Sequence, residues 1–418
     1  MGWISRPIFP QSLTNIQWGK RMSGVGGTVE QGYENIREAF AEGQAGDEGG
    51  AQLCIYRDGR KIVDLWTGRD TVNDRPYTEE TVAVMMSVSK GAVATCAHML
   101  SERGLLDLDA PVARYWPEFG EAGKEAVTVS DLLTHRAGLT SFEPASGVGP
   151  RELLDWDRCT AALAAMAPLW PPGTAYMYHA VTYGYLVGEV IRRVTAKTPG
   201  RYFADEIAAP LGLRLWIGLP QSEERHVAPH FSRRPALTLE QWTMLLKGFG
   251  IDTDSRVAQT MMHMIVGTGE AIAMINSREG HAAEIPAANM IGDAASLARM
   301  YAATIGEVDG VRLLSPQTVA RATRWQTEGL SAPGDFAKLP NPSPLRYGLG
   351  YQLTRSVAPM LGEGSFGHDG AGGRIGFAHP QSGIAVGYVC NNMLWDGMRG
   401  PDERWVPWTA ALREKLGL

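Results

Sequence analysis

Alternating apolar and polar positions predict β-strands near both ends of the chain. The stretch AQLCIYRDGRKIVDLWTG (residues 51–68) reads as two strands joined at Asp58-Gly59, a dipeptide typical of tight hairpins. The same pattern returns near the C-terminus. The strands expected there cover residues 346–353, 372–380 and 384–391.

Helical spacing of apolar residues dominates the rest of the chain. Residues 88–103 predict an amphipathic helix, with Val93, Ala97 and Leu100 on one face and Gly104 at the position of a C-terminal cap. The stretch TYGYLVGEVIRRV (residues 182–194) predicts another helix. Residues 126–215 are expected to be mostly helical. Further helices are expected over residues 28–45, 294–306, 315–324 and 402–416.

Strands at both ends with helices between them predict an α/β (α+β) fold. In this arrangement an antiparallel sheet is flanked by helices, and a mainly helical domain is inserted. At 418 residues the chain exceeds the size of a single growing core. We expect residues 1–125 and 286–418 to form the sheet domain and residues 126–285 to form the inserted domain.

A methionine-rich segment spans residues 220–285. Two interpretations of it stay open: a helical core patch, or a cap over an apolar acyl pocket, since methionine adapts to varied shapes. The methionines concerned are Met244, Met261, Met262, Met264 and Met274.

Composition and charge narrow the possible partners. The net charge of -6, with no long basic run, gives no reason to expect a nucleic-acid or membrane partner. Residues 1–20 lack an uninterrupted apolar segment, so no secretory signal is expected. The scattered cysteines are expected to be reduced thiols in a cytoplasmic protein. These cysteines are Cys54, Cys96, Cys159 and Cys390.

Several well-known motifs are missing from the sequence. It contains no G-x-S-x-G, no H-E-x-x-H, no Walker A and no dinucleotide-binding fingerprint. His98, His263 and His281 lack metal-ligand spacing to one another. We therefore expect neither a metal nor a cofactor.

The candidate chemistry begins at Ser87-Val88-Ser89-Lys90, where a strand and loop lead into the predicted helix. A serine at a helix start benefits from the positive end of the helix dipole, and its free N–H can face an oxyanion. Lys90 lies three residues on, so it shares a helix face with Ser87. A buried lysine can lose its proton and then accept the serine proton. Taken alone, the pattern also fits a capping serine beside a solvated lysine.

Two further segments complete the set. Tyr178, in PGTAYMYHA (residues 172–180), could hydrogen-bond both Ser87 and Lys90 and shuttle a proton, or be an ordinary half-buried aromatic residue. The glycine-rich segment GHDGAGG (residues 367–373) could bring a strand edge close to a ligand, or be a simple turn.

Taken together, these motifs resemble the serine β-lactamase and penicillin-binding superfamily, with its S-x-x-K and K-T-G motifs. The chain is most similar to the class C-like branch, which includes family VIII carboxylesterases and related transacylases. The resemblance runs from about residue 30 to the C-terminus. Supporting segments are GLLDLDAPVARYWPEFG, VTVSDLLTHRAGL, PPGTAYMYHAVTYGYLVGEVI, IGDAASLARMYA and GHDGAGGRIGFAHPQSGIAVGYV.

The resemblance implies a role for each matching residue. Ser87 is the nucleophile, and Lys90 and Tyr178 share the general base and acid roles. The backbone N–H groups of Ser87 and Ala371 form the oxyanion hole. His135 matches a structural position. The residues on the K-T-G strand, expected to contact substrate, are His368, Asp369 and Gly370.

Two departures from the family pattern argue against efficient β-lactam hydrolysis. The Y-x-N motif of class C enzymes is Tyr178-His179-Ala180 here, so an amide is missing. The K-T-G lysine is His368, followed by Asp369, so a permanent cation is expected to be absent. Both departures fit neutral esters or amides better.

The sequence thus predicts a serine hydrolase that cleaves a small-molecule ester or amide through an acyl-serine intermediate. One alternative is a transacylase that passes the acyl group to an amine or alcohol in natural-product tailoring. Others are a D-amino peptidase, a weak β-lactamase, or a non-catalytic binding protein of the same fold. Nothing in the sequence indicates an oligomeric state.

Overall fold

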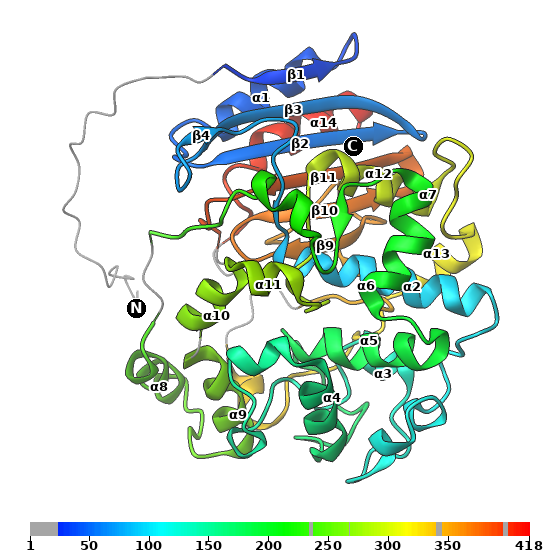
Figure 1. Ribbon diagram of the computed structural model, residues 1–418, viewed down its shortest axis with the longest axis vertical. Coiled ribbons are helices and arrows are strands. Elements are labelled where there is room, and N and C mark those ends of the chain that lie inside the picture. The colour runs from blue at the N-terminus through cyan, green and yellow to red at the C-terminus, as the bar shows by residue number, and fades with distance from the viewer. Residues whose placement is uncertain (1–23, 234–236, 267, 340–344, 396–399) are drawn as a thin grey trace, which may run out of the picture.

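One antiparallel sheet is built from both ends of the chain (Figure 1). The computed structural model describes residues 24–233, 237–266, 268–339, 345–395 and 400–418. The sheet has eight strands in the order β1-β3-β2-β11-β10-β9-β8, with β4 paired to β3. Its strands are β1 (Gly26–Val29), β2 (Gly50–Arg57), β3 (Arg60–Asp70), β4 (Arg75–Pro76), β8 (Gln352–Leu353), β9 (Phe366–Gly370), β10 (Arg374–His379) and β11 (Ile384–Cys390).

The central pairing joins the two ends directly. Strand β2 lies antiparallel to β11, from Arg57 beside Ile384 to Ala51 beside Cys390. The expected hairpin forms β2 and β3, and both Asp58 (φ +48°) and Gly59 (φ +77°) adopt the left-handed backbone that such a two-residue turn needs. The predicted fold class is therefore confirmed.

Side chains alternate between two cores on either face of the sheet. Leu53 and Ile55 of β2 face a cluster with the terminal helices α1 (Glu34–Gly43) and α14 (Val406–Leu416). Their neighbour Cys54 faces the larger core with α12 (Ala294–Ile305). The sheet is thus covered by helices on both faces.

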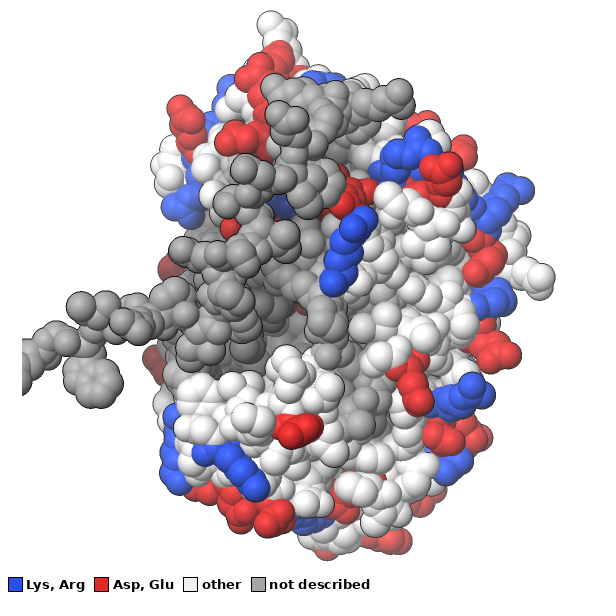
Figure 2. All heavy atoms as spheres, turned by 90° about the vertical axis from the view of Figure 1, so that its left-hand side faces the viewer, with Lys and Arg blue, Asp and Glu red and all other residues white. Residues whose placement is uncertain are grey.

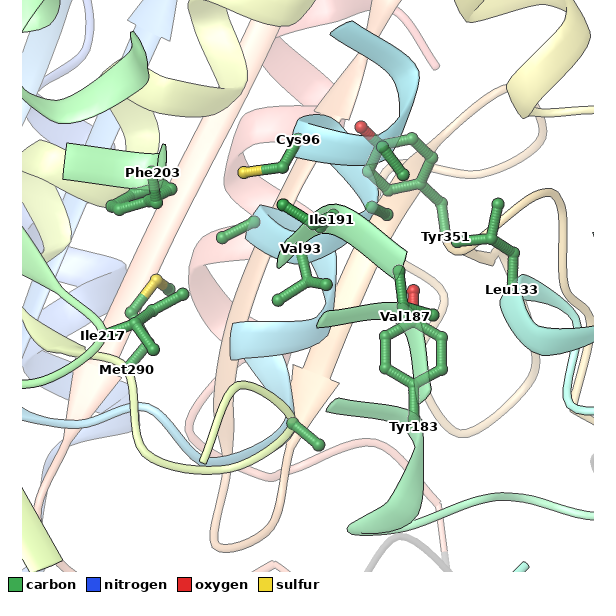
Figure 3. Close-up of a cluster of buried hydrophobic side chains, with 14 of the residues drawn as sticks. Val93, Cys96, Leu133, Tyr183, Val187, Ile191, Phe203, Ile217, Met290 and Tyr351 are labelled. Atoms are coloured by element: carbon green, nitrogen blue, oxygen red, sulfur yellow. The ribbon is translucent and has the colours of Figure 1, made fainter. Parts of the chain in front are cut away.

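Helix α2 (Ser89–Glu102) runs through the centre of the larger core. Residues 89–100 are all buried, so the helix is not amphipathic as expected: its polar positions also face protein. Val93 and Cys96 of α2 lie near Val187 and Ile191 of α5 (Thr182–Thr195) in Figure 3. The C-terminal glycine prediction holds, since Gly104 has φ +70°.

Shorter helices and a second sheet make up the rest of the molecule. A three-stranded sheet has the order β5-β7-β6, with β5 (Ala83–Val84), β6 (Leu215–Trp216) and β7 (Ile291–Gly292). The remaining helices are α3 (Val129–Leu133), α4 (Trp156–Ala165), α6 (Pro199–Phe203), α7 (Ala209–Leu211), α8 (Leu239–Gly248), α9 (Arg256–Val266), α10 (Thr268–Ile275), α11 (Arg278–Ala282) and α13 (Pro316–Ala322). The division at residues 125/126 and 285/286 stays a prediction.

Three predicted boundaries differ from the structure. The expected helix over 28–45 is shorter, because Val29 pairs with Val63 as part of β1. The expected strand over 346–353 shrinks to β8, because Tyr347 and Gln352 bridge to each other around Gly350 (φ +85°). The last helix begins at Val406 and not at residue 402.

The methionines of residues 220–285 do not share one environment. Met262 is buried in a small cluster with Leu246 of α8 and Phe336, whereas Met244 is 67% exposed. The core-patch interpretation holds for Met262 and not for Met244, and the cap over an acyl pocket stays a prediction. The side chain of Met264 lies outside the described residues, as do residues 1–20.

Acidic and basic side chains are interspersed over the described residues on the face shown in Figure 2. Among the described residues, no helix combines the length and apolarity needed to cross a lipid bilayer.

Candidate active site

Ser87 sits on a sharp elbow between β5 and α2. It belongs to a short 3₁₀ helix, η1 (Met86–Val88), that leads directly into α2. Met86 has φ +50°, a strained value for a side-chain-bearing residue and one that is common at functional sites. The elbow is held by Ser89, whose Oγ donates to Met86 O (2.5 Å) and accepts from the N–H of Met290 (3.0 Å).

Ser87 is the one residue between Thr81 and Leu100 that is partly exposed; all others in this stretch are buried. The elbow therefore presents one hydroxyl to the surface from an otherwise closed core.

The amino group of Lys90 is fully buried and lies 3.1 Å from Ser87 Oγ. It donates to the carbonyl oxygens of Ala180 (2.7 Å) and Ala287 (2.9 Å). Burial lowers the pKa of Lys90 well below its usual value, and the nearby Asp369 carboxylate opposes this shift. Nζ thus has three oxygen neighbours, and in its neutral form it can give its two N–H bonds to the carbonyls and turn its lone pair toward the Ser87 hydroxyl.

Tyr178 lies against both of these residues. Lys90 Nζ lies 4.8 Å from the centre of its ring, and Ser87 is near enough to its hydroxyl to act on the pKa of the phenol. Burial raises the pKa of Tyr178, with Ser87 acting in the opposite direction. A neutral phenol can pass a proton on while Lys90 supplies the basic lone pair.

The loop that carries Tyr178 is fixed by His135. The Nδ1 of His135 accepts from the N–H of His179 (3.1 Å), and its carbonyl accepts from the N–H of Met177 (3.2 Å). Its ring lies 4.9 Å from that of Tyr178. Burial lowers the pKa of His135 well below its usual value, which favours the neutral ring. These contacts make His135 a support for the tyrosine loop.

Strand β9 passes directly behind the serine. A Cβ on Gly370 would lie 2.6 Å from Met85 O and 3.3 Å from the Ser87 nitrogen, so only glycine allows this approach. Ala371, which is exposed, follows at the start of the turn to β10. Within the described parts of the chain, the N–H groups of Ser87 and Ala371 have no hydrogen-bond acceptor. Two adjacent unused donors suit a developing oxyanion.

His368 and Asp369 are less available than expected. His368 is fully buried, with Nε2 3.1 Å from the Tyr347 hydroxyl and Nδ1 2.5 Å from Asp369 O. Asp369 is paired with Arg355, whose side chain is 7% exposed, through a 2.5 Å contact between Oδ2 and Nη2. Arg355 brings a cation to this strand from another segment, but Asp369 engages it. The expectation that the site offers no permanent cation to a β-lactam carboxylate therefore stays a prediction.

Sequence reasoning missed four partners of the site. Ala180 and Ala287 act through backbone carbonyls, and no side-chain pattern marks a carbonyl. Tyr347 lies in the stretch that reads as a strand (residues 346–353), where nothing distinguishes it from sheet residues, and Arg355 lies two residues beyond that stretch. Among the described residues, no group of three His, Cys, Asp or Glu side chains is arranged to hold a metal ion.

Comparison with known proteins agrees with this geometry. Residues 36–406 match the family model described as Beta-lactamase. The chain is 33% identical to the esterase/beta-lactamase LipL of Mycobacterium tuberculosis, covering 88% of this chain and 83% of that protein. It is 27% identical to the esterase EstB of Burkholderia gladioli, covering 83% and 85%. A crystal structure of a family VIII carboxylesterase is 32% identical with a TM-score of 0.79, covering 94% of this chain and 99% of that one.

Proposed function

This chain belongs to the Beta-lactamase family, and from that premise we propose that it cleaves a carboxylic ester or amide through an acyl-serine intermediate on Ser87. The family makes it a serine hydrolase, with relatives named as esterases and β-lactamases. Lys90 and Tyr178 are the proposed acid–base pair. The proposed oxyanion donors are the N–H groups of Ser87 and Ala371.

In the first step, Ser87 Oγ attacks the carbonyl carbon as its proton moves to the Lys90 lone pair. The carbonyl oxygen becomes an oxyanion between the two N–H donors. When the C=O bond re-forms, the bond to the leaving alcohol or amine breaks. The leaving group takes the proton held by Lys90 through Tyr178, and acyl-Ser87 remains.

In the second step, water occupies the place of the leaving group. It gives a proton to the Lys90–Tyr178 pair and attacks the acyl carbon. The bond between the acyl carbon and Oγ then breaks, and the proton returns to Ser87. An amine or alcohol in place of water would make the same chemistry an acyl transfer.

The observation that carries this proposal is the hydrogen-bonding of Lys90. Two carbonyls use both N–H bonds of a neutral amine, so its lone pair has one direction left, toward Ser87 Oγ. A solvated lysine beside a capping serine would have neither the burial nor these fixed partners.

The substrate class follows from the same site. Asp369 and Arg355 neutralise each other, and His368 is buried, so we propose a neutral acyl donor rather than an anionic β-lactam.

The test is a burst experiment with p-nitrophenyl butyrate, followed by nitrophenol release and intact mass. We expect one equivalent of nitrophenol in the burst and a butyryl adduct that Ser87→Ala abolishes. Ser101→Ala, at the other end of α2, is the matched control and should keep both signals. An adduct that survives in Ser87→Ala would reject the nucleophile assignment. Discharge only on addition of an amine would favour acyl transfer over hydrolysis.

We also propose a cytoplasmic location. All four cysteines are unpaired and buried, as expected for a chain kept in a reducing compartment. Fractionation of cells producing the full chain tests this, and recovery of the protein outside the cytoplasm would overturn it.

A further inference from the structure

The turn between β9 and β10 is held by its carbonyl groups. The oxygen of Ala371 accepts from Arg374 Nη1 (2.8 Å) and the oxygen of Gly373 accepts from Trp405 Nε1 (2.8 Å). The carbonyl between them, that of Gly372, accepts from Arg404 Nη2 at 2.6 Å. Three successive peptide oxygens are thus fixed by side chains.

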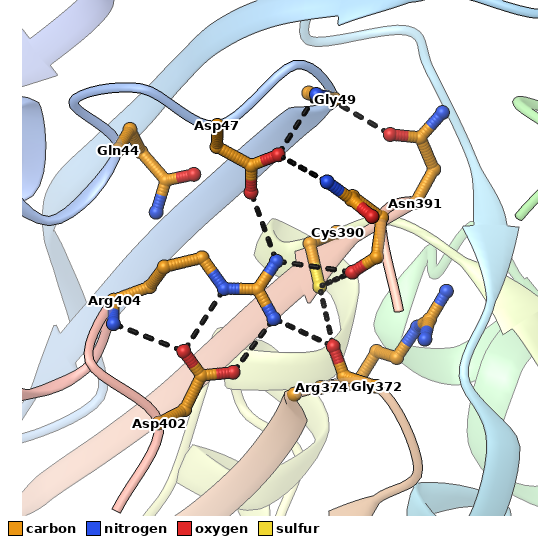
Figure 4. A network of polar contacts seen from close by, with 12 residues as sticks. Gln44, Asp47, Gly49, Gly372, Arg374, Cys390, Asn391, Asp402 and Arg404 are labelled. Carbon is orange, nitrogen blue, oxygen red and sulfur yellow. Dashed lines mark hydrogen bonds and ion pairs between the residues drawn. The ribbon is translucent and has the colours of Figure 1, made fainter. Parts of the chain in front are cut away.

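Arg404 uses all five of its N–H donors in this network (Figure 4). Nε donates to Asp402 Oδ1 (3.0 Å), and Nη2 donates to Asp402 Oδ2 (2.6 Å) as well as to Gly372 O. Nη1 donates to Asp47 Oδ2 (3.0 Å) and to Asn392 O (3.0 Å). The planar fork of arginine fixes these directions, which the three donors of a lysine cannot reproduce.

The network is buried and joins distant parts of the chain. The side chains of Arg404, Asp47 and Asp402 are each 3–4% exposed. Asp47 follows α1, whereas Asp402 and Arg404 precede α14. The network therefore connects the turn to the segments next to both terminal helices. Buried ion pairs seldom add much net stability, so this one calls for another explanation.

The backbone is shaped to receive this pair. A Cβ on Gly373 (φ +105°) would lie 2.1 Å from Asp402 Oδ2 and 2.2 Å from Arg404 Nη2. A glycine there lets the ion pair lie against the turn itself.

We propose that Arg404 is a positioning residue that fixes the β9–β10 turn, and through it the direction of the Ala371 N–H toward the oxyanion. The proposal rests on the proposed function, in which that N–H stabilises the tetrahedral intermediate. The Gly372 carbonyl shares a peptide plane with the Gly373 N–H, which donates to Gly370 O (3.0 Å), and Gly370 O shares a peptide plane with the Ala371 N–H. Rotation of the Gly372 carbonyl therefore changes the tilt of the plane that carries the Ala371 N–H. Arg404 contacts no substrate in this scheme.

A purely structural role and a positioning role predict different kinetics. Loss of stability alone lowers the folded fraction and leaves the folded enzyme unchanged. Loss of alignment lowers acylation and the affinity for a tetrahedral analogue together, with KM for the ester nearly unchanged.

The test compares Arg404→Lys with wild type, using p-nitrophenyl butyrate and a butylboronic acid inhibitor at a temperature where circular dichroism shows both folded. We expect acylation to fall by on the order of 10- to 100-fold, less than for complete loss of a donor. Boronate affinity should fall in proportion. Trp405→Phe keeps an aromatic ring at this position and removes the Nε1 contact to Gly373 O, so it tests the proposal if Arg404→Lys does not fold. A several-fold loss in both measurements is expected for it.

Glu189→Gln is the matched control. Glu189 is a buried carboxylate that accepts from Trp156, Arg192 and Arg193 at distances of 2.7–2.8 Å, and it has no contact with the turn. It should lower Tm and leave acylation intact.

Wild-type acylation and boronate binding in Arg404→Lys, or in Trp405→Phe where Arg404→Lys does not fold, would overturn the positioning role. So would an equal loss of acylation in Glu189→Gln. Either result leaves the acyl-serine proposal intact, because that proposal fails only if Ser87→Ala still forms the adduct.

Discussion

At the scale of single residues, the protonation state of Lys90 decides whether Ser87 can react. Burial lowers the Lys90 pKa, so the neutral amine is populated at lower pH than for an exposed lysine. We expect the acylation rate to rise with pH through this lowered pKa and then level off. Stopped-flow measurement of acylation from pH 5 to pH 10 gives this rising limb of the pH–rate profile. Its apparent pKa belongs to the Lys90–Tyr178 pair as a unit.

Two variants test the direction in which this limb of the pH–rate profile moves. The Asp369 carboxylate raises the Lys90 pKa, so Asp369→Asn should move the limb to lower pH, provided the variant folds with Arg355 unpaired. Lys90→Arg stays protonated and should lose on the order of 100- to 10,000-fold in acylation with no limb. A limb that moves to higher pH in Asp369→Asn would contradict the assignment.

How much of the site is predictable depends on how far apart in the sequence its contacts lie. Ser87 and Lys90 are three residues apart, so helical geometry alone brings them together. Tyr178 and the glycine strand required the family pattern. Arg355 and Arg404 could not be predicted, because Arg355 pairs with Asp369, 14 residues away, and Arg404 reaches Gly372 and Asp47, 32 and 357 residues away. An arginine in a loop has no local signature of such contacts.

At the scale of elements, the elbow before α2 is held by one hydroxyl. Ser89 Oγ joins Met86 O to the N–H of Met290. Ser89→Ala leaves that buried N–H unpaired, which costs about 1–3 kcal/mol of unfolding free energy. We expect acylation to fall with KM nearly unchanged. The substitution removes the support of Ser87 but leaves the groups that contact the substrate in place.

Urea denaturation and burst kinetics measure the two effects of Ser89→Ala. Thr95→Ser, further along α2, is the control, because serine keeps the hydroxyl that is hydrogen-bonded to Gly91 O and to the Tyr351 hydroxyl. Unchanged burst kinetics in a destabilised Ser89→Ala would mean that the elbow is set by the backbone of η1 alone.

Elements with local signals were predicted well, and elements set by long-range contacts were not. The hairpin at Asp58-Gly59 and the cap at Gly104 depend on neighbouring residues. By contrast, α2 has polar positions that look solvent-facing in sequence. They are buried because α2 crosses the centre of the larger core. Only tertiary packing contains that information.

At the scale of the whole molecule, the sheet depends on its C-terminal helix. Trp408 of α14 is fully buried and stacks on Tyr388 of β11 with ring centres 6.0 Å apart. Trp408→Ala should lower the free energy of unfolding by about 3–5 kcal/mol. Acylation should persist while the protein is folded, because α14 lies on the face of the sheet opposite α12.

Denaturant midpoints measure the loss of stability in Trp408→Ala. The control is a substitution at the partly exposed Trp242 of α8. Trp242→Ala should shift the midpoint much less than Trp408→Ala. Equal shifts would mean that the sheet does not depend on α14 in this way.

The four buried cysteines leave no thiol of this protein open to reagents. A single cysteine introduced at exposed Met244 of α8 would therefore be the sole target of a maleimide dye, without prior removal of native sulfurs. Fluorescence from that one label would follow helix α8 in real time as acyl donors arrive and depart, molecule by molecule.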